Sequence, residues 1–241
     1  MRKVLLEVCV DDAEGLAAAI AGGADRIELC SSLELGGLTP SPGLIQLAAT
    51  AAIPVYAMIR PRAGDFIFTP READQMLHEI DAIHTAGLAG VVLGASREDG
   101  RLDEAMLQGL THHAAGLGTT LHRAFDLVPV LGEATETAIG LGFERILTSG
   151  RAPTSAQGLD DLAATIEAAS GRISIMPGSG VNSGNAAQIL SRLAVTEIHA
   201  SGSATINDVN KHAARLGFET GLRRKTDARI VTALKTLLET L

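Results

Sequence analysis

The sequence predicts a single (β/α)₈ barrel, an α/β fold in which each of eight parallel strands is followed by a helix. The chain has 241 residues, close to the roughly 250 that are typical of this fold. Eight short apolar runs alternate with helical patterns at about 30-residue intervals, as expected for parallel strands joined by crossover helices. Because eight strands close a barrel and no segment is left over, we expect residues 1–241 to form one domain.

The expected strands are residues 4–10, 26–30, 55–60, 90–94, 119–123, 145–148, 173–176 and 197–200. Helix boundaries carry the usual signals: Asp12 precedes the first helix, and Ser41 and Thr69 each stand before a proline at a first helical position. Residues 69–86 place Met76, Ile80 and Ile83 on one helical face, so this helix is expected to pack against the barrel. Residues 202–225 lack periodicity and predict a long final loop in the position of a lid, followed by a last helix over 226–241.

The composition argues against several classes of partner. Hydrophobic residues make up 46% of the chain but aromatic residues only 2%, and the net charge is −8. A negative protein with few aromatic rings is a poor match for nucleic acid or an anionic membrane surface. Glu7 and Asp11 interrupt the first apolar run, which therefore resembles neither a signal peptide nor a membrane span. We expect a cytosolic protein whose two cysteines stay reduced.

Alternation along the strands separates two faces. In the first run Leu6 and Val8 share one face, whereas Glu7 and Cys9 share the other, which we expect to point into the barrel. By the same alternation, side chains of four other runs are expected to point into the barrel. They are Glu28 and Cys30 on the second run, Tyr56, Met58 and Arg60 on the third, Thr120, His122, Ala124 and Asp126 on the fifth, and Glu197, His199 and Ser201 on the eighth. The fourth, sixth and seventh runs have no clear faces. Each buried polar group needs an internal partner or a ligand, and catalytic residues of this fold come from the C-terminal ends of several strands.

Several segments give the chain a family resemblance over most of its length. They are Glu-Val-Cys-Val-Asp (7–11), Gly-Gly-Ala-Asp-Arg-Ile-Glu-Leu-Cys-Ser (22–31), Gly-Gly-Leu-Thr-Pro-Ser (36–41), Met-Ile-Arg-Pro-Arg-Ala-Gly-Asp-Phe (58–66), His-Arg-Ala-Phe-Asp (122–126), Arg-Ile-Leu-Thr-Ser-Gly (145–150) and Met-Pro-Gly (176–178). In these segments the chain resembles the CutC copper-homeostasis family. The resemblance implies a cytosolic barrel, a link to copper tolerance with the paired cysteines as Cu(I) ligands, and a homodimer or larger assembly. Ser179 and Ser203 depart from the family pattern, in which a further glycine and, in some relatives, a basic residue are expected.

Two functions remain open from the residues themselves, and the first is copper binding. Cys9 and Cys30 are expected at matching heights on adjacent strands, about 4.8 Å apart, so that two sulfurs would share one ion. Met58 adds a thioether, and soft sulfur ligands favour Cu(I). The alternative is that both cysteines are buried packing groups, since free cysteine is among the most buried residue types.

The second candidate is an enzyme for a small anionic or phosphorylated carbonyl or sugar compound, although no reaction can be assigned. Its candidate residues are Glu7 and Glu28 as bases, His122 and His199 as proton carriers, Arg60 and Arg123 as anion clamps and Asp126 beside them. Arg123 is expected to face outward by alternation. The loops with Gly178, Ser179, Gly180, Ser201 and Gly202 follow the seventh and eighth strands, which form the phosphate site in many barrels. An interaction scaffold without chemistry is a third, weaker alternative.

Overall fold

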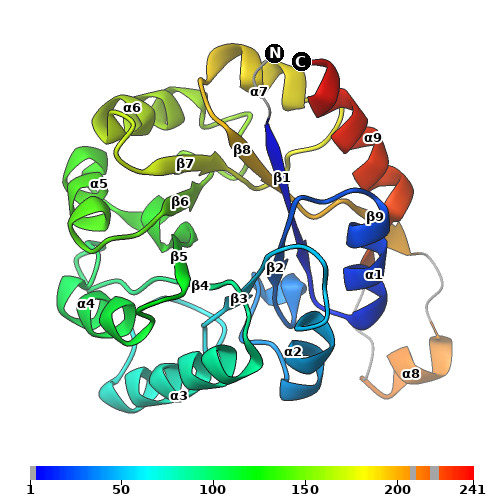
Figure 1. Cartoon of the computed structure of the whole chain (residues 1–241), viewed down its shortest axis with the longest axis horizontal. Coiled ribbons are helices and arrows are strands. Elements are labelled where there is room, and N and C mark those ends of the chain that lie inside the picture. Colours follow the sequence, from blue (N-terminus) through cyan, green and yellow to red (C-terminus); the bar gives the residue numbers. More distant parts are fainter. Residues whose placement is uncertain (1–3, 207–209, 218–222) are drawn as a thin grey trace.

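The computed structural model describes residues 4–206, 210–217 and 223–241 and confirms the (β/α)₈ barrel (Figure 1). Its parallel strands are β1 (Leu5–Val10), β2 (Arg26–Leu29), β3 (Val55–Met58), β4 (Gly90–Leu93), β5 (Gly118–Leu121), β6 (Arg145–Thr148), β7 (Ser174–Pro177) and β8 (Glu197–Ala200). Each strand from β1 to β6 is hydrogen-bonded to the next one in sequence, and β8 pairs with β1. The C-terminal strand ends therefore meet at one mouth.

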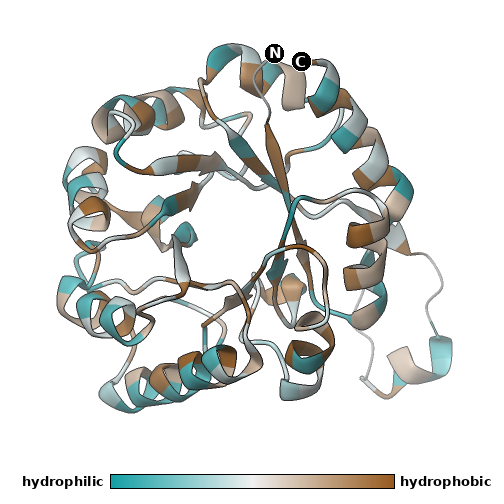
Figure 2. Cartoon of the chain, viewed as in Figure 1, coloured by the Kyte–Doolittle hydropathy of each residue, from teal (hydrophilic) through white to brown (hydrophobic). Residues whose placement is uncertain are grey.

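Helices surround the strands (Figure 1), and Figure 2 shows that they carry both hydrophobic and hydrophilic residues. They are α1 (Ala13–Ala21), α2 (Pro42–Ala48), α3 (Pro70–Ala86), α4 (Glu104–His113), α5 (Leu131–Gly140), α6 (Leu159–Ala169), α7 (Ala186–Arg192) and α9 (Ala228–Thr240). Thr69 begins α3 in a capping box with Glu72, and this helix buries Met76, Ile80 and Ile83 as expected. None of the helices among the described residues is long and apolar enough to cross a membrane.

The expectation of an unbroken loop over residues 202–225 is wrong. β9 (Ser203–Ile206) and β10 (Arg223–Thr226) form an antiparallel pair, and the short helix α8 (Lys211–Arg215) lies between them in sequence. These elements are short and largely exposed, so no apolar alternation marks them. Figure 1 shows α8 outside the ring of helices. Residues 207–209 and 218–222 of the expected loop lie outside the described residues.

The fifth strand ends earlier than its sequence pattern predicts. Leu121 is the last residue of β5, and the chain turns at once into a 3₁₀ helix, η2 (Arg123–Leu127). Strand alternation therefore does not apply to Arg123 or Asp126. The early turn sends Arg123 toward the barrel mouth instead of outward.

Candidate functional site

A cavity of about 250 Å³ lies at the barrel mouth, where parallel-barrel proteins carry their active sites. Its lining combines residues from several strands and the loops that follow them: Cys9, Glu28, Leu33, Gly36, Met58, Arg60, Phe66, His122, Arg123, Leu147, Ser179, Gly180, His199, Ala200 and Ser201. Eight of the thirteen residues predicted for the site from sequence are in this lining. The five others, Glu7, Cys30, Asp126, Gly178 and Gly202, lie behind it or beside it.

Glu7 lies beneath the cavity, where it supports other groups. It is fully buried, accepts a hydrogen bond from Arg26 and accepts a second one from His199 Nδ1 at 2.9 Å. Burial raises the pKa of Glu7, but the hydrogen bond from His199 and the charge of Arg26 outweigh it and lower the pKa to about 2. A carboxylate with so low a pKa is a weak base, so Glu7 is better suited to holding His199 in place.

Glu28 is the carboxyl group that faces the cavity. Its Oε2 lies 3.7 Å from His199 Nε2 and accepts from Cys30 Sγ at 3.7 Å. Burial raises the pKa of Glu28, although the neighbouring imidazole opposes this. The pKa of His199 is also raised, because the charge of Glu28 and the contacts with Cys9 and Glu7 outweigh its burial. The raised pKa makes Glu28 a stronger base than Glu7, so Glu28 is the carboxyl group of the two that is better suited to exchanging protons with a ligand.

The two cysteines are not at matching heights. In the pairing of β1 with β2, Cys9 lies opposite Glu28, and Cys30 follows two residues further along. The Glu-x-Cys pattern recurs on both strands, but hydrogen bonding sets the register so that the second copy is displaced. Burial and the charge of Glu28 raise the pKa of the Cys30 thiol well above its ordinary value. Two adjacent thiolates are thus disfavoured here.

A different set of donor atoms does come together. The ligand atoms of Cys9, Glu28 and His199 all lie within 4.8 Å of one another, and these residues are buried. Sulfur, oxygen and nitrogen donors in this arrangement match the mixed ligand sets of several transition metals. Glu7 behind His199 provides the carboxylate support that metal-binding histidines usually have.

Asp126 holds a loop and an arginine in place. Its carboxylate accepts hydrogen bonds from Thr148 Oγ1 at 2.6 Å and from the backbone N–H of Ser149 and Arg151. It also pairs with Arg123 Nε at 2.7 Å, and Arg123 lines the cavity. We therefore assign Asp126 a positioning role, with Arg123 as the group able to meet an anion.

The loops after β7 and β8 reach the cavity only in part. Ser179 adopts a φ of 72°, a left-handed conformation that favours glycine, which explains why glycine was expected there. Its Oγ donates to the carbonyl oxygen of Pro153 at 2.8 Å. Gly178 packs against Leu147 and His199. α7 begins at Ala186, and no lining residue comes from 181–192, so the helix N-terminus takes no part in the predicted anion site.

The loop after β8 carries the second departure from the family pattern. Ser203 Oγ contacts Ser201 Oγ at 2.8 Å and accepts from Arg224 Nε at 3.0 Å. The basic group expected at this point is therefore supplied by β10. Gly202 lies behind the site, where its carbonyl oxygen accepts from the N–H of Asp227.

Sequence reasoning placed Glu7 and Glu197 in the interior but missed the two arginines that pair with them in a charged layer below the cavity. Arg26 bridges Glu7 and Glu197, and Arg145 lies 3.4 Å from Glu197 and over the ring of Tyr56. Arg26 shares the inward alternation of Glu28, so its position was readable from the second strand. Arg145 begins a strand whose faces were ambiguous. This layer neutralises the buried carboxylates and closes the barrel below the site.

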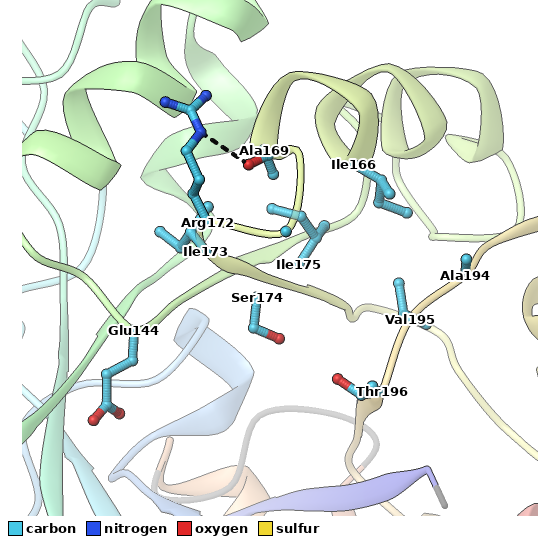
Figure 3. A pocket seen from close by; sticks show the side chains of 11 residues that line it. Glu144, Ile166, Ala169, Arg172, Ile173, Ser174, Ile175, Ala194, Val195 and Thr196 are labelled. Carbon is cyan, nitrogen blue, oxygen red and sulfur yellow. Dashed lines mark hydrogen bonds between the residues drawn. The ribbon is translucent and has the colours of Figure 1, made fainter. Parts of the chain in front are cut away.

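A second cavity, of about 490 Å³, lies near the N-terminal ends of the strands (Figure 3). Its lining includes Ser174 at the start of β7 and Thr196 just before β8. Arg172 is engaged by Glu136 and the carbonyl oxygen of Ala169, and Glu144 by Tyr56. None of the residues predicted for the site lies here, and this end of the fold usually serves stability.

Comparisons with known proteins agree with this description. Residues 4–204 match the family model described as the CutC family. A CutC family protein from Sinorhizobium medicae is 57% identical over 241 residues, covering 100% of this chain and 98% of that protein. The crystal structure of a CutC protein from Streptococcus agalactiae has 30% identity and a TM-score of 0.78, covering 82% of this chain and 98% of that one.

A more distant structure supports the fold alone. Thiamine phosphate pyrophosphorylase from Pyrococcus furiosus is 19% identical with a TM-score of 0.60, covering 99% of this chain and 97% of that one. The family match and the close relatives confirm the resemblance seen in the sequence. The chain belongs to the CutC family.

Proposed function

We propose that this protein is an enzyme that moves protons on a small anionic or phosphorylated carbonyl or sugar compound bound at the barrel mouth. One observation carries the proposal: three residues of the cavity lining each bury a polar atom without a hydrogen-bond partner among the described residues. These atoms are Glu28 Oε1, Arg60 Nε and His122 Nε2. A buried unsatisfied polar group costs about 1–3 kcal/mol, so three at one cavity favour a ligand that pairs with them.

The proposed chemistry centres on Glu28. Its raised pKa suits a carboxyl group that removes a proton from carbon and later returns it. His199, held by Glu7 and protonated, lies beside it as an acid for a neighbouring oxygen. Arg123 is 41% exposed, and Asp126 and Ser149 engage its Nε and Nη2, so that Nη1 would meet the anionic group of a substrate. The CutC family name alone assigns none of these roles.

Hydrogen–deuterium exchange tests this proposal without knowledge of the full reaction. The protein is incubated in D₂O with a panel of aldose phosphates, ketose phosphates and 2-oxo acids, and deuterium entry beside the carbonyl is followed by NMR. Glu28→Gln should slow exchange by roughly 100-fold or more, as expected for loss of a general acid–base group. Glu136→Gln, which changes a surface carboxylate, is the matched control. The proposal would be refuted if neither wild type nor Glu136→Gln catalysed exchange. It would also be refuted if Glu28→Gln catalysed exchange at the same rate as wild type.

Copper binding is the second candidate, favoured by the cluster of Cys9, Glu28 and His199. Copper would then be the cargo of a homeostasis protein. The residues fit a single-thiolate site better than the expected pair, because Cys30 is displaced by two residues and its thiol pKa is raised. Anaerobic Cu(I) titration against a competing chelator distinguishes the two arrangements. Cys9→Ser should lose affinity for Cu(I), and Cys30→Ser should keep it. An equal loss of affinity in both variants would instead support a site formed by the two cysteines together, and no loss in either variant would exclude copper at this site.

Two further expectations remain proposals. The cysteines are free thiols, which suits the reducing cytosol, and fractionation of cells that express the protein tests this location. The family resemblance implies self-assembly, which sedimentation velocity tests.

A further inference from the structure

We infer that His122 and Arg60 form an oxyanion-binding wall of the cavity, in which His122 donates from Nε2 as a neutral imidazole. This inference rests on the proposed function and deepens it by naming the substrate class. The substrate would be a carbonyl compound whose oxygen becomes negatively charged, as in an enediolate. His122 would then stabilise charge rather than carry protons.

The backbone fixes the position of the imidazole proton. The N–H of Ala124 donates to His122 Nδ1 at 3.2 Å, at the start of the 3₁₀ helix η2. A ring nitrogen that accepts a hydrogen bond carries no proton, so in the neutral ring the proton resides on Nε2. Nε2 is buried and has no partner among the described residues, although His122 lines the cavity. Capping η2 requires only Nδ1, and the second nitrogen is left available to a ligand.

The surroundings of the ring keep it neutral. His122 is 3% exposed, and Gly94 lies so close that an added Cβ would be 2.5 Å from the ring. Burial and the charge of Arg60 lower the pKa of His122 to about 3. A neutral imidazole can donate one strong hydrogen bond to a developing oxyanion without first giving up a proton.

Arg60 supplies positive charge to the same wall. Its Nη1 donates to the carbonyl oxygens of Leu35 and Gly37, and its Nη2 donates to that of Gly64. These contacts hold the guanidinium without neutralising it, since no ion pair joins Arg60 to a carboxylate of the described residues. Its Nε is buried without a partner in the same part of the chain. A buried, uncompensated cation is costly, and an anionic ligand would remove that cost.

Phe66 joins the two donors into one wall. Its ring centroid lies 4.7 Å from that of His122, and the Arg60 guanidinium lies over the same ring at 4.9 Å. This wall comes from segments after β3 and β5, whereas Glu28 comes from β2. A substrate between the two sides could lose a proton from carbon to Glu28, while the C–H electron pair forms the C=C bond and the carbonyl electrons move onto oxygen. That oxygen would be held by the wall. Transfer of a proton from the adjacent hydroxyl to this oxygen, with return of the carbon-bound proton from Glu28 to the former carbonyl carbon, moves the C=O bond to the neighbouring position and completes an isomerisation without a further reactant.

The first test examines the imidazole itself. Long-range ¹H–¹⁵N NMR of histidine-labelled wild-type protein between pH 5 and 8 reports which nitrogen carries the proton, with His122→Gln for assignment. We expect His122 to hold its proton on Nε2 and not to titrate. A proton on Nδ1, or a titration within this range, would overturn the inference regardless of any substrate.

The second test measures an anion that mimics an enediolate phosphate. 2-Phosphoglycolate is titrated by calorimetry into wild type, His122→Leu, His122→Gln and the surface control His78→Leu, with thermal unfolding as a check on folding. We expect roughly 10- to 100-fold weaker binding by His122→Leu, as for loss of a hydrogen bond to a charged group. The glutamine variant, which keeps a donor, and the control should bind nearly as well as wild type.

The outcomes separate the inference from the proposed function. Equal binding by His122→Leu and wild type would overturn the oxyanion wall and leave the anionic substrate standing. No binding to wild type up to about 10 mM, a limit that corresponds to a very weak complex, would count against both.

Discussion

Replacing Glu7 by glutamine should cost about 3 kcal/mol of stability at pH 7. Glu7 is completely buried, and its interactions with His199 and Arg26 lower its pKa from an ordinary value of 4.5 to about 2. A difference of that size between the folded and unfolded states corresponds to about 3 kcal/mol. This agrees with the lower end of the cost of breaking a buried ion pair, about 3–5 kcal/mol.

The pH dependence gives the prediction its sign. A carboxyl group with a lowered pKa stabilises the folded state above its unfolded pKa, and this contribution is lost as the pH falls through the folded pKa. The difference in unfolding free energy between wild type and Glu7→Gln should therefore be constant above about pH 5 and shrink between pH 4.5 and about 2. Urea unfolding followed by circular dichroism at several pH values measures it. Glu136→Gln, at an exposed ion pair, is the control and should leave stability unchanged.

Two results would refute this reasoning. A cost below about 1 kcal/mol at pH 7 would mean that Glu7 behaves as a surface carboxylate. A cost that grows as the pH falls toward 3 would mean that the pKa of Glu7 is raised by burial and that its partners do not compensate.

Three further predictions concern other parts of the fold. Ser179→Gly should be at least as stable as wild type, whereas Ser179→Ala should be less stable by about 1 kcal/mol, because alanine keeps the left-handed φ of 72° and loses the hydrogen bond to Pro153. Thermal unfolding checks this order of stability, and an alanine variant more stable than wild type would contradict it. Iodoacetamide should modify Cys9, at the cavity, well before the fully buried Cys30 in folded protein; peptide mass spectrometry would show the reverse order if the cavity assignment is wrong. Thr69→Ala should destabilise the protein by about 1 kcal/mol through loss of the α3 cap, and chemical denaturation with an unchanged midpoint would refute this.

Much of the barrel was available from local patterns. Short apolar runs and helix caps located the strands and most helices, because burial and capping act over a few residues. Alternation placed Glu28 and His199 correctly in the interior. The same rule failed for Arg123, since β5 ends at Leu121 and alternation has no meaning in a 3₁₀ helix. Alternation also did not reveal the short strand pair β9 and β10, because these strands bury too little surface to require alternating apolar residues.

The sequence by itself determined the fold, the end of the barrel where the candidate site lies and most of the side chains that line its cavity. Only the tertiary structure decided what those side chains do, because their partners come from distant parts of the chain. The register between β1 and β2 places Cys9 opposite Glu28 and not opposite Cys30. Burial against Arg26 keeps Glu7 ionised, whereas the same burial without a full set of partners raises the pKa of Glu28. Protonation states depend on the three-dimensional surroundings, which spacing along a strand does not specify.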